Sequence, residues 1–275
     1  MLEPGRFEGR VVTVIQARTG SSRLPNKSIM MLAGKPLLLQ VVERVKRSAH
    51  VGVVVVATTE EPEDDIIQDM CLKQGIPVFR GSTNDLLDRH YQAARKFEAD
   101  AVVKIPSDCP LIDPSVIDKT LSYFKENFPH YDYVSNLHPA SYPDGNDVEI
   151  MTMPALEAAW RVADRPLERE HTTPYFWENP DLFSCGNITW ETGRDYSMTH
   201  RWTIDYIEDY CFIKAVYEEL YTKKPAFNLY DVLLFIESKP SIADINAHYN
   251  GVNWYRHHLH ELKTIRPAQT MPIVS

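Results

Sequence analysis

The loop that follows the first strongly apolar run of the chain gathers side chains able to bind phosphate. The stretch "ARTGSSRLPNK", residues 17–27, carries three cations and two serine hydroxyls around Gly20. A triphosphate needs such donors, because its charge must be met by N–H groups and by ammonium or guanidinium groups. The GxxxxGK[ST] motif of P-loop kinases and ATPases is excluded, since no second glycine stands before Lys27. The pattern alone supports a phosphate-binding loop and a solvated turn equally well.

Two aspartates at the ends of strand-like runs could hold a metal ion. Asp108 lies in "VKIPSDCPLIDP" and Asp205 ends "HRWTID". Carboxylate oxygens are the hard ligands that Mg²⁺ prefers when it also binds phosphates. Each aspartate has a structural alternative. Asp108 could cap the following turn, although Asp113 fits that role better, and Asp205 could cap the helix expected after it, with Asp209 as a structural first-turn acid. For Asp205 the pattern alone favours the cap.

The first half of the chain alternates strand-like and helical patterns that would bring these groups together. The strand-like runs are "VVTVIQA", "VGVVVVA", "IPVFR" and "AVVKIP". Helical patterns over residues 35–49, 61–75 and 84–99 separate them, the last with Asn84 as its expected N-cap. Continuous apolar strands alternating with helices indicate a parallel sheet covered on both faces. Right-handed crossovers then place the ligand-binding loops at one edge of that sheet.

The second half is less regular and predicts a mixed extension of the same sheet. Strand-like "YDYVSN" and "DVEIMTM" bracket the loop "HPASYPDG", and "HRWTID" is expected to add a further strand. Helices are predicted at 154–163, around 168–178, at 206–220 and at 229–237, with a terminal helix at "WYRHHLHEL". We expect one domain over 1–275, divided into a nucleotide-binding half (about 11–135), an acceptor-binding and dimerisation half (about 136–250) and a C-terminal tail (251–275).

Net charge, cysteine spacing and hydropathy argue against several classes of protein. The net charge of −9 argues against a general nucleic-acid-binding protein, which needs a basic face, but leaves room for a locally positive pocket. The four cysteines are scattered without a CxxC pair, so neither zinc nor a disulfide framework is predicted. The N-terminus lacks the apolar segment of a signal peptide, and "VGVVVVA" is too short to span a bilayer. We therefore expect a cytoplasmic protein that binds no membrane.

At its N-terminal loop the chain resembles a known family. The segment "IQARTGSSRLPNKSIMMLAGKPLL" is similar to the signature of cytidylyltransferases, above all the spore-coat polysaccharide group related to CMP-3-deoxy-manno-octulosonate and CMP-sialic acid synthetases. "DCPLIDP" and "RWTIDYIEDY" resemble the same family, although Ser107 stands where the family usually has glycine. The resemblance runs from about Val11 to about Tyr249. It implies a nucleotide-diphospho-sugar-transferase-like α/β fold, Rossmann-like and of GT-A type, with a mixed, mainly parallel sheet flanked by helices.

The resemblance also implies roles for individual residues. Catalysis would depend on Arg18, Arg23 and Lys27, which hold the phosphates, and on Asp108, which with Asp205 would bind the Mg²⁺ cofactor. Residues expected to bind the nucleotide are Ala17, Arg18, Gly20, Ser22, Arg23, Lys27, Ala57, Thr58, Thr59, Arg80, Ser82 and Asp85. For the last three, an ordinary capped helix explains the pattern as well.

Two further segments resemble the spore-coat group specifically. "YPDGNDVEIMT" places Asp147 and Glu149 toward one face of a strand, where they could touch substrate or metal. "EREHTTPYFWENP" makes Arg169 and His171 candidates for reading an acidic substrate, against the alternative of a helix with a satisfied histidine. All four are expected to bind the acceptor.

The implied function is CTP-dependent transfer of CMP to an acidic sugar or related small acceptor, with release of pyrophosphate, for surface polysaccharide or glycoconjugate synthesis by a homodimer. A phosphonate or sugar phosphate could replace the acidic sugar, and the preference for CTP over other triphosphates is open. A GT-A-type glycosyltransferase is a second possibility, although no D-x-D motif stands at a strand end. A non-catalytic nucleotide-binding module is a third, and the set Lys27, Asp108 and Asp205 argues against it.

Overall fold

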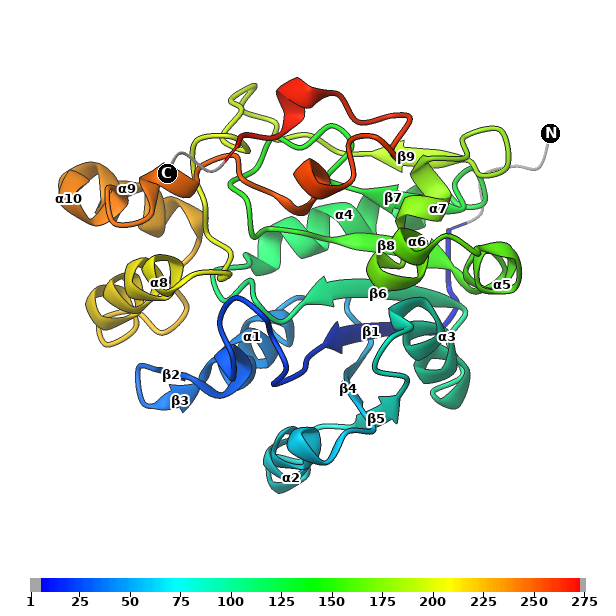
Figure 1. Cartoon of the computed structure of the whole chain (residues 1–275), viewed down its shortest axis with the longest axis horizontal. Coiled ribbons are helices and arrows are strands. Elements are labelled where there is room, and N and C mark those ends of the chain that lie inside the picture. Colours follow the sequence, from blue (N-terminus) through cyan, green and yellow to red (C-terminus); the bar gives the residue numbers. More distant parts are fainter. Residues whose placement is uncertain (1–5, 273–275) are drawn as a thin grey trace.

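Apolar, β-branched runs form the centre of one mixed sheet. The computed structural model describes residues 6–272, and there the sheet has the order β5-β4-β1-β6-β8-β7-β9 (Figure 1). Every neighbouring pair is parallel except the two that involve β8. The predicted fold class, a mixed and mainly parallel α/β sheet, is confirmed. The strands are β1 (Val11–Gln16), β4 (Val53–Thr59), β5 (Val78–Gly81), β6 (Ala101–Pro106), β7 (Tyr133–Ser135), β8 (Glu149–Thr152) and β9 (Cys185–Asn187).

Helices cover both faces of this sheet (Figure 1). None of those in residues 6–272 is long and apolar enough to cross a membrane. They are α1 (Leu37–Val45), α2 (Asp65–Lys73), α3 (Leu86–Lys96), α4 (Pro114–Glu126), α5 (Met153–Val162), α6 (Pro166–His171), α7 (Pro174–Trp177), α8 (Ile207–Leu220), α9 (Leu229–Ser238) and α10 (Pro240–Ala243).

The period of two along the strands divides the core into two layers. In β1, Val12 and Val14 pack with α3 and α5, whereas Ile15 belongs to the layer formed with α1, α4, α8 and α9. Alternate side chains of a strand point to opposite faces, so a strand buried on both faces must be apolar throughout. This is why "VVTVIQ" could be identified as a central strand from sequence.

The direction of β8 brings the second half of the chain to the ligand-binding edge. The strands β1, β4 and β6 all end at one edge of the sheet, and β8 runs antiparallel to β6 with Glu149 opposite Lys104. The start of β8 therefore lies beside the end of β6. Residues 143–148, just before β8, and residues 107–113, just after β6, consequently meet at the same edge.

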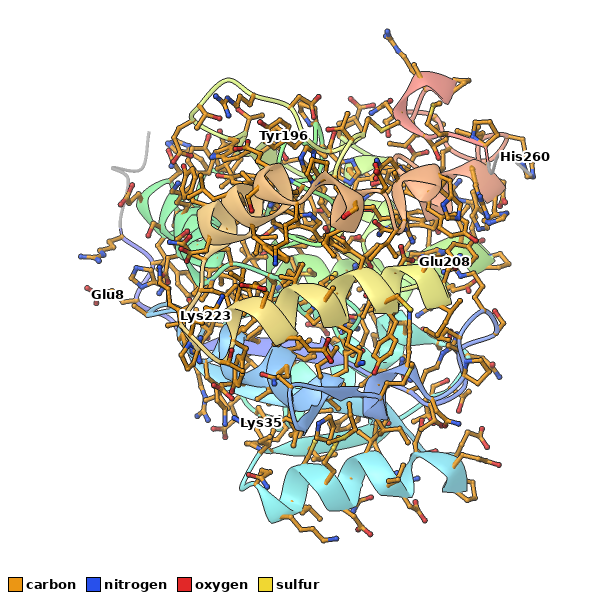
Figure 2. The ribbon with its side chains drawn as sticks, turned by 90° about the vertical axis from the view of Figure 1, so that its left-hand side faces the viewer. Glu8, Lys35, Tyr196, Glu208, Lys223 and His260 are labelled. Carbon is orange, nitrogen blue, oxygen red and sulfur yellow. The ribbon has the colours of Figure 1, made fainter. Side chains whose placement is uncertain are left out.

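Helix α8 holds the N-terminal loop against that edge. The helix begins directly after Asp205, and in Figure 2 it extends from Glu208 toward Lys223. It packs on the small hairpin of β2 (Met31–Leu32) and β3 (Lys35–Pro36), where the Tyr210 hydroxyl donates a 2.8 Å hydrogen bond to the Met31 carbonyl. Since the hairpin follows Lys27 closely, this contact fixes the loop beside Asp205.

Most predicted elements are present, but two predicted helices are wrong. The helix predicted around 168–178 is two short helices, α6 and α7, interrupted where Thr172 adopts a φ of 71°. Pro174 lacks the N–H that a continuous helix needs and disfavours helical backbone before it. The helix predicted at "WYRHHLHEL" is only a 3-10 turn at Trp254–His257.

Two local predictions also require correction. "HRWTID" forms no strand; it contributes one isolated bridge between Arg201 and Asp144. The N-cap of α3 is Asp85, whose carboxylate accepts the Asp88 N–H at 2.8 Å, rather than Asn84. By contrast, Asp113 caps α4 as predicted.

A close approach of two backbone segments requires glycine at position 145. Gly145 has a φ of +100°, and a Cβ there would lie 2.7 Å from the carbonyl carbon of Trp202. We expect Gly145→Ala to lower the free energy of unfolding by at least about 2 kcal/mol, because it adds a backbone overlap to the cost of a left-handed conformation. Denaturant unfolding would measure this loss.

Gly193→Ala is the matched control. Gly193 also has a positive φ, +70°, but a Cβ there meets nothing within 4 Å. This substitution should cost only about 1 kcal/mol. Equal losses in the two variants would contradict the role given to the close approach.

Candidate active site

Lys27 joins the two aspartates that the sequence singled out. Its Nζ donates to Asp108 Oδ2 at 2.8 Å, to Asp205 Oδ1 at 3.2 Å and to the Ile204 carbonyl at 2.6 Å. Burial would lower the pKa of Lys27, but the charges of both aspartates outweigh burial and raise it. Lys27 is therefore a permanent cation between two carboxylates from distant parts of the chain.

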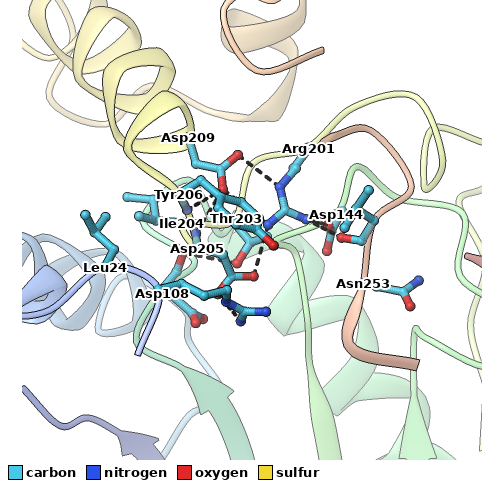
Figure 3. Close-up of polar contacts among 12 residues, drawn as sticks. Leu24, Asp108, Asp144, Arg201, Thr203, Ile204, Asp205, Tyr206, Asp209 and Asn253 are labelled. Carbon is cyan, nitrogen blue, oxygen red and sulfur yellow. Dashed lines mark hydrogen bonds and ion pairs between the residues drawn. The ribbon is translucent and has the colours of Figure 1, made fainter. Parts of the chain in front are cut away.

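Arg201 orders the other side of the same cluster (Figure 3). The guanidinium is buried and donates to Asp209 at 2.9 Å, to Asp205 at 3.0 Å and to Asp144 at 3.5 Å. It also donates to the Val252 carbonyl at 2.5 Å. Burial disfavours the charge, yet the surrounding carboxylates raise the pKa of Arg201. Arg201 thus fixes one oxygen of Asp205 and leaves the other to face Lys27.

Asp205 does not cap the helix that follows it. The N-cap of α8 is Tyr206, and Asp209 accepts the backbone N–H groups of Asp205 and Tyr206 at 2.9 and 3.0 Å. The cap that pattern alone favoured for Asp205 is therefore wrong, and its carboxylate is available for other contacts. Although burial acts to raise it, the pKa of Asp205 is lowered by Lys27, Arg23 and Arg201.

The donor set of Asp108 and Asp205 fits a magnesium ion that also binds phosphate. One oxygen of each reaches the same ammonium, so both can reach a single small cation. Within residues 6–272 no three His, Cys, Asp or Glu side chains gather closely enough to hold a metal on their own. Two carboxylates completed by phosphate oxygens and water are a usual way of binding Mg²⁺ in nucleotide enzymes.

The rest of the N-terminal loop, residues 17–27, is exposed at its tip and held by hydrogen bonds at its base. Arg18, Gly20 and Ser22 are exposed. At the base, Thr19 donates to the buried carboxylate of Asp64 through its backbone N–H and its hydroxyl, both at 2.7 Å. The base of the loop is therefore held by hydrogen bonds, while Arg18, Ser22 and Arg23 are exposed, as phosphate binding requires. Arg23 also reaches Asp205, at 2.6 Å.

Asp64, which the sequence reading did not select, also organises the end of β4. Thr59 donates to it at 2.5 Å, and Ala17 donates its N–H to the Ala57 carbonyl at 3.0 Å. Burial would raise the pKa of Asp64, but the hydrogen bonds from Thr59 and Thr19 lower it. The predicted nucleotide-binding residues Ala17, Ala57, Thr58 and Thr59 are all buried beside this carboxylate or in the strand that leads to it.

Arg80 and its neighbours are engaged in structural contacts. The Arg80 guanidinium donates to the Thr59 and Glu61 carbonyls, both at 2.8 Å, and pairs with Asp65. Ser82 accepts the Asp85 N–H at 3.1 Å, which continues the cap of α3. These contacts are those of the capped-helix alternative.

The predicted acceptor residues separate into two groups. Arg169 lies 3.4 Å from Asp85 and donates to the Trp160 carbonyl at 2.8 Å, so it belongs to the packing of α6 on α3. Asp147, Glu149 and His171 line a cavity of about 430 Å³ that also includes Arg23, Asp108 and Asp205. The structure thus brings the predicted metal ligands and three of the four predicted acceptor residues into one cavity.

Within this cavity, Glu149 and Asp147 differ in their partners. Glu149 is buried, pairs with Lys104 and accepts the Tyr133 hydroxyl at 2.6 Å. Asp147 accepts only the Gly145 N–H, at 3.2 Å, among its hydrogen bonds in the described chain. Burial and the nearby charge of Glu149 raise the pKa of Asp147 to about 6. Among residues 6–272, Asp147 is therefore a carboxylate that makes no ion pair.

The segment expected to be a tail forms a wall of the cavity. Gly251, Asn253, Trp254, Tyr255, Ala268 and Gln269 all line it. Glu178 holds this segment by accepting the Lys263 and Thr264 N–H groups at 2.6 and 2.9 Å. His171 stacks on Trp254 with centroids 3.9 Å apart, and burial lowers the pKa of His171 to about 3.

Sequence reasoning missed several groups in and around this cavity: Asp64, Asp144, Trp177, Arg201, Trp254 and Tyr255. Asp144 and Arg201 stood inside the quoted motifs "YPDGNDVEIMT" and "HRWTID", where a charged residue near an expected ligand was a usable signal. The aromatic pair "WY" near the C-terminus carried no positional signal, since its place over the cavity depends on the fold.

The chain is similar to known proteins over most of its length. A cytidylyltransferase family model matches residues 12–231. The chain is 36% identical to an uncharacterized protein of Methanocaldococcus jannaschii over 242 residues (86% of this chain, 95% of that protein). It is 30% identical to the spore coat polysaccharide biosynthesis protein SpsF of Bacillus subtilis (85% and 96%). A cytidylyltransferase structure from Leptospira borgpetersenii superposes with a TM-score of 0.80 at 37% identity (85% and 96%).

The unneutralised Asp147 predicts a pH-dependent stability. A carboxyl whose folded pKa is about 6, against an ordinary value near 3.8, destabilises the fold above that ordinary value and most fully above pH 6. We expect Asp147→Asn to raise the free energy of unfolding at pH 7 and to lose this advantage as pH falls toward 4. Denaturant unfolding across this range measures the difference. A gain that stays constant down to pH 4 would contradict the assignment.

Proposed function

The chain belongs to the cytidylyltransferase family and is a nucleotidyltransferase that uses CTP, and from this premise we propose that it activates an acidic sugar for surface polysaccharide or glycoconjugate synthesis. A relative 30% identical over 85% of the chain is named for spore coat polysaccharide biosynthesis. A 3-deoxy-manno-octulosonate cytidylyltransferase of Trichlorobacter lovleyi is 34% identical over 43% of the chain. The observation that carries the proposal is the convergence of Lys27, Asp108 and Asp205 at one edge of the sheet.

The proposed reaction is an in-line displacement at phosphorus. A hydroxyl oxygen of the acceptor forms a bond to the α-phosphorus of CTP, the bond to the pyrophosphate oxygen breaks, and the hydroxyl proton is released. Such a transfer needs positioning and charge neutralisation more than covalent participation by the enzyme. The rigid loop of residues 17–27 and the carboxylate pair supply these two functions.

Three cations are available for the pyrophosphate. Arg18 is exposed on the loop, and Arg23 and Lys27 now neutralise Asp205. A triphosphate that enters the site competes for these ammonium and guanidinium groups, which hydrogen-bond phosphate as well as carboxylate. Lys27 and Arg23 therefore pass from the carboxylates to the leaving group, and Arg201 stays behind to orient Asp205.

Asp108 and Asp205 would hold the Mg²⁺ that we propose as cofactor. When bound, the ion supplies positive charge at the reacting phosphate. The buried Arg201 fixes the orientation of Asp205 from behind, as groups around metal ligands commonly do. Within the described residues, the remaining carboxylate oxygen of Asp108 has one hydrogen-bond partner, the Cys109 thiol, which donates at 3.7 Å.

We also place the enzyme in the cytoplasm as a homodimer. The four cysteines are free thiols, which accords with a reducing compartment. The dimer rests on the family resemblance. The family match over residues 12–231 favours CMP transfer over the alternative of glycosyl transfer.

A pyrophosphate-release screen tests the proposed reaction. CTP, UTP, ATP and GTP would each be offered with Mg²⁺ and with 3-deoxy-manno-octulosonate, N-acetylneuraminic acid, a phosphonate or a sugar phosphate. We expect release with CTP and an acidic sugar, at a rate at least about tenfold above that with UTP. Asp108→Asn, which keeps the side-chain shape, should lower kcat at least about 100-fold. Turnover of UTP at the same rate as CTP, or full activity of Asp108→Asn, would contradict the proposal.

The metal site can be tested without turnover. In Lys27→Met the two carboxylates lose their shared cation, so the free energy of unfolding should fall by about 2 kcal/mol. Mg²⁺ should restore most of this loss, measured as a shift in the thermal midpoint. Lys35→Met, which removes an exposed ion pair with Glu43, is the control and should respond little to Mg²⁺. Equal responses of the two variants would exclude Asp108 and Asp205 as the metal site.

A further inference from the structure

The cavity that holds the predicted acceptor residues is rich in carboxyl groups, one of which, Asp144, has its pKa raised by burial to about 8. Among the described residues that line it, three are cations, so carboxyl groups outnumber cations two to one. An acceptor bearing nothing but negative charge would meet repulsion over much of this surface. The carboxylates are Asp108, Asp144, Asp147, Glu149, Asp195 and Asp205.

The three cations of the wall are already engaged by the protein. Lys104 is paired with Glu149, and Arg23 with Asp205 at 2.6 Å. Arg201 donates to the buried Asp209 at 2.9 Å and to other oxygens around it. None of the three lies against Asp147, whose carboxylate has only a backbone partner. Asp144 has Arg201 at a long 3.5 Å.

Aromatic side chains line the same cavity, and burial together with the nearby charges of Glu149, Asp147 and Asp144 raises the pKa of Tyr255. Trp177 and Tyr255 lie with centroids 6.1 Å apart, and His138 is 4.4 Å from Trp177 and 6.0 Å from Tyr255. Burial lowers the pKa of His138 to about 4, so this ring is neutral at pH 7. Aromatic faces next to carboxylates attract organic cations, because the negative face of the ring adds to the attraction of the acid.

Part of this wall comes from outside the family core. Trp254 and Tyr255 line the cavity, yet they follow the last residue matched by the family model, residue 231. They are held over the cavity by the contacts of Glu178 with residues 263–264. The recognition surface for the acceptor is therefore built partly by this chain's own C-terminal segment.

Two buried polar atoms point independently to a missing ligand. The indole Nε1 of Trp177 and the amide oxygen of Gln16 are buried and have no hydrogen-bond partner in the described residues. Trp177 is only 6% exposed, and both residues line the cavity. A buried donor or acceptor without a partner is costly, so such atoms commonly mark where a ligand completes the hydrogen bonds.

We propose that the acceptor carries a protonated amino group, which Asp147 and Asp144 bind against the aromatic wall of Trp177 and Tyr255. This inference rests on the proposed transfer reaction, since Asp108 and Asp205 line the same cavity. The acceptor is thus an acidic sugar that also bears an amino group, and its reacting hydroxyl lies near Asp108. Its other hydroxyls supply partners for Trp177 and Gln16. A cavity of about 430 Å³ suffices for a single sugar residue.

A second metal ion explains the free carboxylates less well. In the part of the chain that the structure describes, no three potential ligands gather closely enough to coordinate one. Metal sites are also built from polar groups, whereas the lining of this cavity includes the aromatic side chains of Trp177 and Tyr255. An ammonium group needs fewer ligands and is favoured by such surroundings.

A binding experiment without CTP separates this inference from the transfer reaction. Glucosamine, N-acetylglucosamine and glucose form a matched set in which only the first carries a protonated amine at pH 7. Titration calorimetry on the full chain should give glucosamine an affinity at least about tenfold above both neutral sugars. Asp147→Asn should bring the three affinities to within about threefold, because it removes the charge and keeps the shape.

Asp195→Asn is the matched control. Asp195 lies at the exposed rim of the same cavity, where it accepts the Ser197 hydroxyl at 2.6 Å. This variant should retain the preference for glucosamine, and thermal unfolding would show that both variants are folded. Glucosamine binding no tighter than glucose, absence of binding by all three sugars, or a preference that survives in Asp147→Asn would overturn the proposal. A preference for glucosamine together with failure of CTP turnover would refute only the transfer reaction.

Discussion

The concentration of carboxylates at one edge of the sheet is the constraint on which the site depends. Asp108 and Asp144 come from separate segments and meet Asp205 and Asp209 at the start of α8, where the four would repel one another without the cations placed between them. Arg201 and Lys27 supply those cations, one fixed by buried contacts and one reaching in from the N-terminal loop. The fold therefore tolerates this acidic site because Arg201 neutralises it permanently, whereas Lys27 neutralises it until a ligand replaces its contacts.

The cations that can exchange partners, Lys27 and Arg23, connect the structure of the site with its proposed function. Lys27 and Arg23 rest on the carboxylates through hydrogen bonds that phosphate oxygens can replace. Asp147, in contrast, makes no ion pair within residues 6–272, and its raised pKa reflects a cost to stability that a positively charged ligand would reduce. In our proposals, Asp108 and Asp205 bind the metal that accompanies the nucleotide, whereas Asp147 and Asp144 bind the acceptor.

Strand direction explains how so many distant residues meet. Parallel strands β1 and β6 deliver the loop of Lys27 and the turn of Asp108 to one edge, as their apolar patterns predicted. The antiparallel β8 brings Asp147 to that edge from the opposite direction. Glycine at position 145 allows its loop to approach Trp202, which places Asp144 beside Arg201.

The sequence by itself determined the central strands, most helices and the ordered motifs around Lys27, Asp108 and Asp205, because periodicity and local spacing are properties of neighbouring residues. It misjudged the helix broken before Pro174 and the C-terminal segment, and it could not separate the paired Glu149 from the unpaired Asp147. Only the tertiary structure decided these points. Whether a carboxylate has a cation, and whether Trp254 and Tyr255 cover a cavity, depends on contacts between residues far apart in the chain, and no local pattern specifies them.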